Sequence, residues 1–264
     1  MKNNTLFLLS SFTMLAFSAC NKTDYLDVSA GDRPPLSANI RFANARIATT
    51  GIQFWTFTQK ITTDAVLPGK ASPYAATTFG NVQINFTEGN GNAYKASRQF
   101  GNSATYSASG GPNGPIAGYY HTVFAASAKN DASKDTLLLF YDDLSAPAAG
   151  KAKLRFVHLA QGIGNVGLKL KQNSTETVLY TAIPYGSAGG SNLQGGAYDS
   201  APFTSVNAGT ISLVVSAGEN ALPVAIDQQA LSNITLDAGK IYTVFIRADN
   251  KGVVSAGIFS ATAL

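Results

Sequence analysis

Few side chains in this sequence could act as a catalytic base or nucleophile. Its 264 residues contain two histidines, His121 and His158, and one cysteine, Cys20. A nucleophilic triad needs Ser or Cys hydrogen-bonded to His together with an orienting acid, and the sequence has no Gly-x-Ser-x-Gly elbow. Both histidines lie in segments that alternate like strands, where a structural role is the usual one. We therefore expect no enzymatic activity and no catalytic residue.

The acidic residues offer little more for site chemistry. The chain has 15 Asp and Glu, and the acids at 131, 135, 142 and 143 leave a calcium site open as an alternative to plain solvation. Two histidines and one cysteine do not make up the usual zinc ligand sets. Glycoside hydrolysis needs a pair of carboxylates, so a weak hydrolase remains only an alternative function. The sequence predicts neither a metal nor a cofactor.

Cys20 has one chemistry that fits its position. The chain starts with Lys2, continues through a mostly apolar stretch over residues 6–19, and reaches the cysteine directly after Ser18 and Ala19. A basic start, a short apolar core and small residues before the cut are what a signal peptidase reads, and the stretch is too short to span a bilayer permanently. With no second cysteine, no intramolecular disulfide can form. We expect cleavage before Cys20 and a lipid on its thiol.

This N-terminus resembles that of bacterial lipoproteins, although Phe17 stands where they usually carry Leu, Val or Ile. Residues 20–27 also resemble the start of glycan-uptake lipoproteins of Bacteroidetes, and nothing after Asp32 does. The resemblance implies an outer-membrane protein, held by its lipid on the periplasmic or the cell-surface side. The membrane is then a partner through the lipid, and residues 20–36 form a tether.

The charge pattern indicates an extracytoplasmic protein that does not bind nucleic acid. Removal of residues 1–19 changes the formal net charge from +4 to +3, because one lysine is lost. The remaining charges are scattered, whereas nucleic-acid binding usually shows a basic block. Only 13% of the residues are charged, and the chain has 25 Gly and 11 Tyr. This composition is typical of strands joined by tight turns.

Strict alternation of apolar and polar residues is the main signal for secondary structure. Successive side chains of a strand point to opposite faces, so an alternating segment predicts a strand with one buried face. Trp55 lies on the opposite side from its apolar neighbours, where we expect a second buried face rather than an exposed platform. Turn residues between these segments predict an all-β fold of antiparallel β-sandwiches, immunoglobulin-like or transthyretin-like. The alternating sets are Ile40 and Phe42; Ile52 and Phe54; Val82, Ile84 and Phe86; and Val166, Leu168 and Leu170.

An internal repeat predicts two tandem domains. Residues 39–43 match 153–157, residues 79–84 match 208–213, and residues 120–124 match 241–245, in the same order. Each half has about the size of one sandwich. The predicted boundaries are a signal peptide over 1–19, the tether over 20–36, a first sandwich over 37–144, a linker over 145–150 and a second sandwich over 151–264.

The second half resembles domain of unknown function 4397. The resemblance covers residues 151–264 and is strongest over 234–245, where a strand, an Ala-Gly turn and a strand containing Tyr-Thr-Val follow one another. The first half resembles a diverged copy. Members of this family are typically secreted or lipid-anchored bacterial proteins, often with tandem copies and without an established activity. The resemblance therefore implies architecture and location.

Two segments, residues 88–115 and 186–200, are expected to be long loops. Tyrosine among Gly, Ser and Asn is typical of binding loops, because the phenol gives contact area and a hydrogen bond at low entropic cost. We expect Tyr94, Tyr106 and Tyr198 to bind a ligand, with flexible linkers as the alternative. The predicted function is a non-enzymatic binding or interaction module of the cell envelope, with a glycan or another envelope protein as partner. The alternative is a glycan-binding or carbohydrate-active accessory protein.

Overall fold

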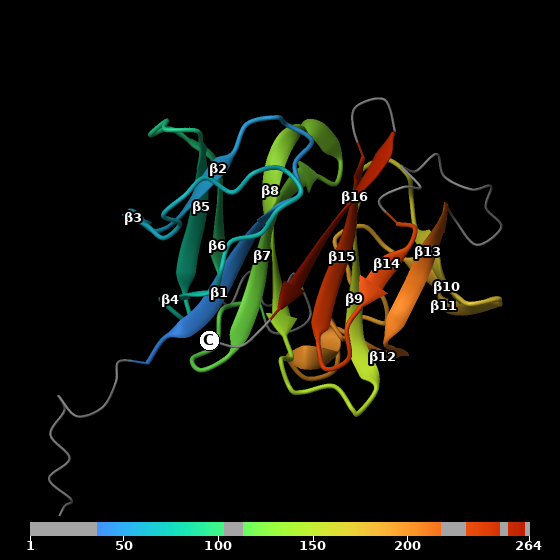
Figure 1. Ribbon diagram of the computed structural model, residues 1–264. Coiled ribbons are helices and arrows are strands. Elements are labelled where there is room, and N and C mark those ends of the chain that lie inside the picture. The colour runs from blue at the N-terminus through green and yellow to red at the C-terminus, as the bar shows by residue number, and fades with distance from the viewer. Residues whose placement is uncertain (1–35, 103–112, 218–230, 249–252, 262–264) are drawn as a thin grey trace, which may run out of the picture. The chain divides into compact units, whose positions relative to one another are not determined.

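The computed structural model describes residues 36–102, 113–217, 231–248 and 253–261 (Figure 1). Within these ranges the chain forms strands, connecting loops and the short 3₁₀ helix η2 (Tyr198–Ser200). The chain from Leu36 onward is one compact unit. The predicted signal peptide, Cys20, most of the tether, and Tyr106 lie outside the described residues.

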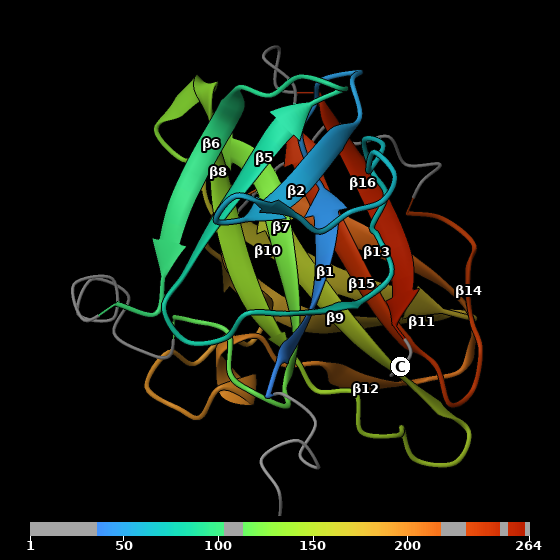
Figure 2. The same cartoon turned by 90° about the vertical axis from the view of Figure 1, so that its left-hand side faces the viewer.

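The first eight strands form two four-stranded sheets that face each other. The outer sheet of this pair, in the order β3-β2-β5-β6, is nearest the viewer in Figure 2, and the inner sheet has the order β4-β1-β7-β8. The strands are β1 (Ala38–Asn44), β2 (Ile52–Thr56), β3 (Gln59–Lys60), β4 (Ala75–Thr77), β5 (Val82–Glu88), β6 (Tyr94–Phe100), β7 (Tyr120–Ala128) and β8 (Asp131–Asp142).

The second eight strands repeat this arrangement strand by strand. Their outer sheet has the order β11-β10-β13-β14 and their inner sheet the order β12-β9-β15-β16. The three sequence matches fall on equivalent strands, namely β1 with β9, β5 with β13, and β7 with β15. The strands are β9 (Lys151–Leu159), β10 (Val166–Gln172), β11 (Thr175–Ile183), β12 (Thr204–Asn207), β13 (Gly209–Ala217), β14 (Ile234–Leu236), β15 (Ile241–Ala248) and β16 (Val254–Ala261).

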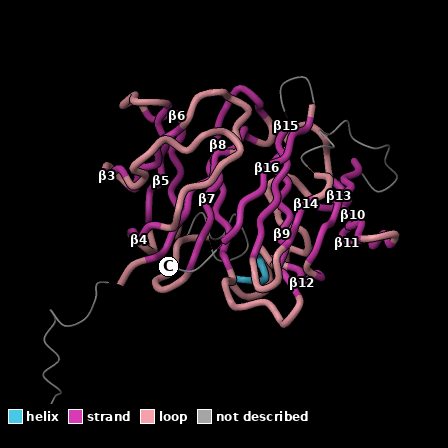
Figure 3. Tube along the Cα trace, in the orientation of Figure 1, coloured by secondary structure: helices cyan, strands magenta, loops and turns pink. Residues whose placement is uncertain are grey.

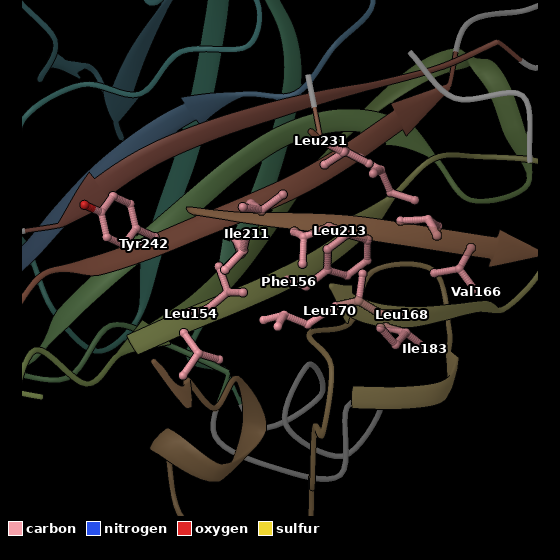
Figure 4. Close-up of a cluster of buried hydrophobic side chains, with 14 of the residues drawn as sticks. Leu154, Phe156, Val166, Leu168, Leu170, Ile183, Ile211, Leu213, Leu231 and Tyr242 are labelled. Carbon is pink, nitrogen blue, oxygen red and sulfur yellow. The ribbon is translucent and has the colours of Figure 1, made fainter. Parts of the chain in front are cut away.

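Each pair of sheets encloses its own hydrophobic core, so the fold consists of two β-sandwiches. The first core contains the predicted alternating residues of the first half, with the rings of Phe42 and Phe54 stacked 4.5 Å apart. The second core includes Phe156, Leu168 and Leu213, which Figure 4 shows packed between strands. Every residue of the alternating sets in the sequence is buried. The prediction of an all-β sandwich fold is confirmed.

The inner sheets differ from the expectation in strand direction. β1 pairs with β7 in parallel, and β9 pairs with β15 in parallel, while their other pairs are antiparallel. The register is the same in both halves, because Arg41 lies opposite Thr122 and Arg155 lies opposite Thr243. Alternation determines which face a side chain occupies and carries no information on strand direction. The parallel pairs are therefore a finding of the structure.

Both faces of each inner sheet are buried, because the two inner sheets pack against each other. Phe124 on β7 and Phe245 on β15 meet edge to face with centroids 5.3 Å apart. The described chain thus has four layers of sheet, visible edge-on in Figure 1. The buried residues of this third cluster are Ala43, Ala45, Phe124, Ala126, Phe140, Val157, Leu159, Ala188, Ala201 and Phe245.

Two buried arginines join the sandwiches by reciprocal contacts. Arg41 on β1 donates to the carbonyl oxygen of Ser260 on β16 at 2.8 Å, and Arg155 on β9 donates to that of Tyr141 on β8 at 3.0 Å. Reciprocity of this kind is what two copies related by a twofold axis make. Each guanidinium group also lies over an aromatic ring of its own half: Tyr74 under Arg41, at 4.1 Å, and Phe203 under Arg155, at 4.4 Å.

One charge breaks this symmetry. Asp142 lies fully buried 2.6 Å from Arg155, and its other oxygen accepts hydrogen bonds from Thr122 at 2.6 Å and Tyr74 at 2.7 Å. The strand registers place Ala261 at the equivalent position of the second half. Arg41 therefore lacks the carboxylate partner that Arg155 has.

Candidate functional site

His121 is a structural side chain of β7. The backbone N–H of Ile116 donates to its Nε2 at 3.1 Å, and its Nδ1 lies 3.4 Å from the carbonyl oxygen of Asn39. Burial lowers the pKa of His121 to about 4. A neutral imidazole with one accepting and one donating nitrogen satisfies both contacts. This histidine is held in its neutral form by the fold.

His158 on β9 is satisfied in the same way. The N–H of Ala160 donates to its Nδ1 at 3.3 Å, and its Nε2 lies 2.7 Å from the carbonyl oxygen of Gly164. Burial lowers the pKa of this histidine too. Both ring nitrogens are hydrogen-bonded to the backbone, so these contacts explain the position of His158 without a catalytic role.

Most acidic side chains of the described residues are held by cations. A hydrogen bond from Arg46 lowers the pKa of Glu88, for example. A carboxylate paired in this way is a poor general acid at neutral pH. Nowhere in the described ranges do three His, Cys, Asp or Glu side chains gather into a set for a metal ion. The pairs are Glu88 and Asp135 with Arg46, Asp131 with Lys134, Asp142 with Arg155, Asp143 with Lys153, and Glu176 with Lys169.

The structure places the described candidate tyrosines in different halves. Tyr94 is 42% exposed at the start of β6, in the first sandwich. Tyr198 is 39% exposed in η2, the cyan segment of Figure 3, and stacks on Tyr119 with centroids 5.2 Å apart. The contacts of Tyr94 are with Trp55 and Phe57, so each tyrosine belongs to its own local cluster.

The expectation of one long loop over residues 88–115 was wrong for part of that segment. Residues 94–100 form β6 and pair with β5 in antiparallel register. Most side chains of this edge strand are exposed or half-buried, so its composition is as polar as that of a loop. Phe100, buried in the first core, is the residue that signals a strand here.

The outward-facing residues of β2, β5 and β6 form a distinct surface, which we call the Trp55 face. Because the alternate residues of these strands enter the first core, the remaining ones point away from it. Figure 2 shows these three strands side by side toward the viewer. The eight residues that make up this surface are uncharged, and two lysines lie beside it: Lys95 on β6, paired with Glu88, and Lys60 on β3, opposite Trp55. The eight residues are Gln53, Trp55, Gln83, Asn85, Thr87, Tyr94, Ser97 and Gln99.

Two aromatic side chains span the Trp55 face. The rings of Trp55 and Tyr94 meet edge to face with centroids 6.1 Å apart. The indole N–H of Trp55 donates to Thr87 at 3.3 Å, and the hydroxyl of Tyr94 donates to the carbonyl oxygen of Phe57 at 3.1 Å. Thr87 and Asn85 on the central strand β5 are fully buried. The rings are therefore fixed in place by hydrogen bonds on a rigid sheet.

Amide side chains surround these rings in fixed orientations. Asn85 donates to the carbonyl oxygen of Phe57 at 2.7 Å and accepts from Gln83 at 2.9 Å and from Ser97. Gln99, in the same row of the sheet, donates to Asn81 at the edge of the face. The bond from Ser97 links β6 to β5, and the bond from Gln83 lies within β5. Side chains held in this way have little rotamer freedom to lose on binding.

The sequence holds a signal for the Trp55 face. Gln53 and Trp55, Gln83 and Asn85, and Ser97 and Gln99 each recur with period two. Our expectation of a buried second face there differs from the structure, because no described sheet covers this side of β2 and Trp55 is half-buried. Amides beside an aromatic residue on the polar half of a strand indicate an exposed, hydrogen-bonding surface.

Two grooves lie beside the edges of the outer sheets. One, of about 500 Å³, is lined by residues 61–67 and 70–75 after β3. The other, of about 570 Å³, lies between β11 and residues 184–193. They occupy equivalent places in the two halves. Of the described residues that line either groove, Asp64 is the one carboxylate; it accepts a hydrogen bond from Thr63 at 3.3 Å, and no histidine lines them to complete a triad.

Among the described residues there is no helix long and apolar enough to cross a membrane.

No curated protein matches the sequence. A solved structure described as a proposed cell adhesion protein of Bacteroides uniformis ATCC 8492 has 9% sequence identity, a TM-score of 0.22, and coverage of 87% of this chain and 99% of its own. A similarity at this level carries no conclusion about fold or function.

The family match falls on the first half of the protein. Residues 38–169 match the model of the domain of unknown function DUF4397, from β1 into β10. The half that we expected to be the diverged copy thus carries most of the match. The matched segment is half of the chain, and it comprises the first sandwich together with β9 and the start of β10. The chain therefore belongs to the DUF4397 family.

Proposed function

We propose that this protein is a lipid-anchored module of the cell envelope that binds a partner without catalysing a reaction. The observation that carries the proposal is the Trp55 face, where two aromatic rings and several amides lie fixed on an uncharged sheet surface. The described histidines are neutral and bonded to backbone, and most described carboxylates are paired with cations. Binding is the chemistry that these groups support.

A binding array tests this function directly. The mature chain from residue 20, with Cys20→Ser to keep it in solution, is applied to immobilised glycans and envelope proteins. We expect at least one component to bind, and Tyr94→Ala to weaken that binding by about fivefold or more, as loss of an aromatic anchor does. Phe79→Ala is the matched control, because Phe79 is 40% exposed in the same half and outside the Trp55 face. Binding that is unchanged by Tyr94→Ala would contradict the proposal.

Tyr198 marks a second candidate surface, and Tyr106 is a further candidate from the sequence. Tyr198 is exposed on η2 and its stacking on Tyr119 fixes the ring, while Tyr106 lies outside the described residues. The same array with Tyr106→Ala and Tyr198→Ala distinguishes the surfaces. Loss of binding in Tyr198→Ala, with Tyr94→Ala unaffected, would place the site at Tyr198, and loss in Tyr106→Ala alone would place it at Tyr106.

The anchor is proposed at Cys20 on the sequence pattern of residues 1–20. Several acyl chains contribute about 0.8 kcal/mol per buried CH₂ group, enough to hold a soluble domain at a membrane. We expect Cys20→Ser to release the protein from the membrane fraction, whereas the unmodified chain stays bound after a high-salt wash. Salt-resistant membrane association of the variant would refute lipid anchoring.

We also propose the domain limits 37–144 and 151–264, joined by residues 145–150. The strand order of the first eight strands recurs in the second eight. β8 ends at Asp142 and β9 begins at Lys151, so the proposed linker lies between them. Each core is formed by residues of one half. These observations support two tandem copies of the domain.

A further inference from the structure

We infer that the ligand of the Trp55 face is a neutral polysaccharide, an inference that rests on the binding function proposed above. The first argument concerns the aromatic rings. One face of a sugar ring presents C–H groups that carry partial positive charge, and the face of an aromatic ring carries partial negative charge. Trp55 and Tyr94 supply two such rings, fixed 6.1 Å apart. The rings are inclined at 64° to each other, so they suit sugar units whose faces turn relative to one another along a twisted chain.

The amides supply the second argument. Sugar hydroxyls donate and accept hydrogen bonds, and a side-chain amide also does both. Gln53, Gln83 and Gln99 are half-buried on the same face as the rings. Gln83 and Gln99 are already oriented through Asn85 and Asn81. A surface of aromatic rings flanked by oriented amides matches the alternation of C–H faces and hydroxyls along a glycan.

Charge and shape narrow the class of glycan. None of the eight side chains of the Trp55 face is charged; Lys60 lies at its edge, opposite Trp55 in the strand register, and Lys95 beside it is paired with Glu88. An uncharged surface suits an uncharged ligand, since burying a charge without a partner is costly. Three strands spaced about 4.8 Å apart, with about five residues each, give a flat area of about 10 by 15 Å. This area suits a stretch of extended chain better than a single sugar.

The test is affinity electrophoresis of the mature Cys20→Ser chain through gels that contain defined polysaccharides. The neutral gels contain xylan, mannan, starch or a β-glucan, and the acidic gels contain polygalacturonate or alginate. We expect at least one neutral polysaccharide to retard the protein. Tyr94→Ala and Gln83→Ala should each weaken retardation at least fivefold, Tyr94→Phe should retain most of it, and Phe79→Ala should leave it unchanged.

The outcomes separate this inference from the proposed function. If a protein on the array binds and Tyr94→Ala abolishes that binding while no neutral polysaccharide retards the chain, the face is a binding site and the glycan inference is wrong. Retardation only by acidic polysaccharides, lost in Lys60→Ala or Lys95→Ala, also overturns the glycan inference, because the lysines would then attract the ligand by charge. Equal retardation of Tyr94→Ala and the parent chain removes both the glycan inference and the site. Melting curves of each variant exclude unfolding as the cause.

Discussion

At the residue scale, buried polar side chains in the two halves perform the same task with different chemistry. Asn44 accepts the N–H of Arg46 at 3.2 Å and donates to the carbonyl oxygen of Val66 at 3.0 Å. His158 occupies the equivalent position on β9 and makes the same pair of bonds, to the N–H two residues later and to a loop carbonyl oxygen. A histidine that can be replaced by an amide in the other half of the same fold is structural.

The lowered pKa of His121 predicts that the protein loses stability in mild acid. Its pKa is 6.5 when unfolded and about 4 when folded, so between these values the unfolded chain binds a proton that the folded chain does not. The free energy of unfolding is therefore highest above pH 6.5 and falls as the pH drops toward 4, by about 2 kcal/mol at pH 5. Carboxylates such as Glu88, whose pKa lies below 4.5, contribute only at lower pH.

The measurement is urea unfolding at pH 7.5, 6 and 5 for the parent chain and for His121→Gln. The variant is less stable throughout, because it loses a buried fit, but its unfolding free energy should change less with pH. The remaining slope comes partly from His158, whose pKa is lowered in the same direction. Identical slopes for the two proteins would show that His121 does not control this dependence.

We expect the same substitution to destabilise the protein by different amounts at the two interface arginines. Arg155→Met leaves the buried carboxylate of Asp142 without its cation, which typically costs about 3–5 kcal/mol. Arg41→Met breaks no direct ion pair; it leaves the carbonyl oxygen of Ser260 without its donor and removes the contact with the Tyr74 ring, at a cost of about 1–2 kcal/mol. Burial also lowers the pKa of Arg41, so its removal relieves a desolvation cost. Denaturant unfolding of both variants measures the difference, and equal costs would mean that the Asp142 pair adds nothing.

At the element scale, two glycines in turns show separately what backbone conformation and crowding of the added Cβ contribute to stability. Gly239 lies between β14 and β15 with φ of +79° and has open space where a Cβ would lie, whereas Gly101 after β6 has φ of +80° and its Cβ would lie 2.1 Å from the carbonyl oxygen of Gly80. Gly239→Ala should cost about 1 kcal/mol from conformation alone. Gly101→Ala should cost about 2–4 kcal/mol, because the backbone must also move.

Thermal unfolding of the two glycine variants checks this difference. Gly118→Ala serves as a further control, since Gly118 has φ of +77° and no atom within 4 Å of the added Cβ. It should behave like Gly239→Ala. A cost for Gly101→Ala no larger than for these two would mean that the loop around Gly80 yields without penalty.

How far the sequence predicts the elements depends on what each strand contacts. Strands that contribute regularly spaced apolar residues to a core, such as β5 with Val82, Ile84 and Phe86, follow from alternation alone. β6 does not, because it is an edge strand whose side chains mostly meet solvent. Strand direction in the inner sheets and the burial of Arg155 follow from contacts between residues far apart in the chain, which local spacing does not encode.

At the scale of the whole molecule, the halves should behave as a bound pair. Residues 36–146 and 147–264, produced as separate chains, each contain a complete core but expose the interface cluster around Phe124 and Phe245. We expect each to melt cooperatively, to self-associate when alone, and to form a 1:1 complex when mixed. Size-exclusion chromatography with light scattering measures this, and independent monomers after mixing would show that the interface is weak.

The position of β1 has a mechanical consequence. It is the first described strand, and it lies inside its sheet between β4 and parallel β7. On the proposed anchoring, tension from the membrane enters the protein at the start of β1 and acts along the strand. The backbone hydrogen bonds that join β1 to β4 and to β7 are then loaded in shear, so many of these bonds must break at the same time. A load on the Trp55 face reaches β1 through the first core and through residues 45–51, which join β1 to β2. The second sandwich braces the opposite side of the loaded sheet without lying in the path of the force.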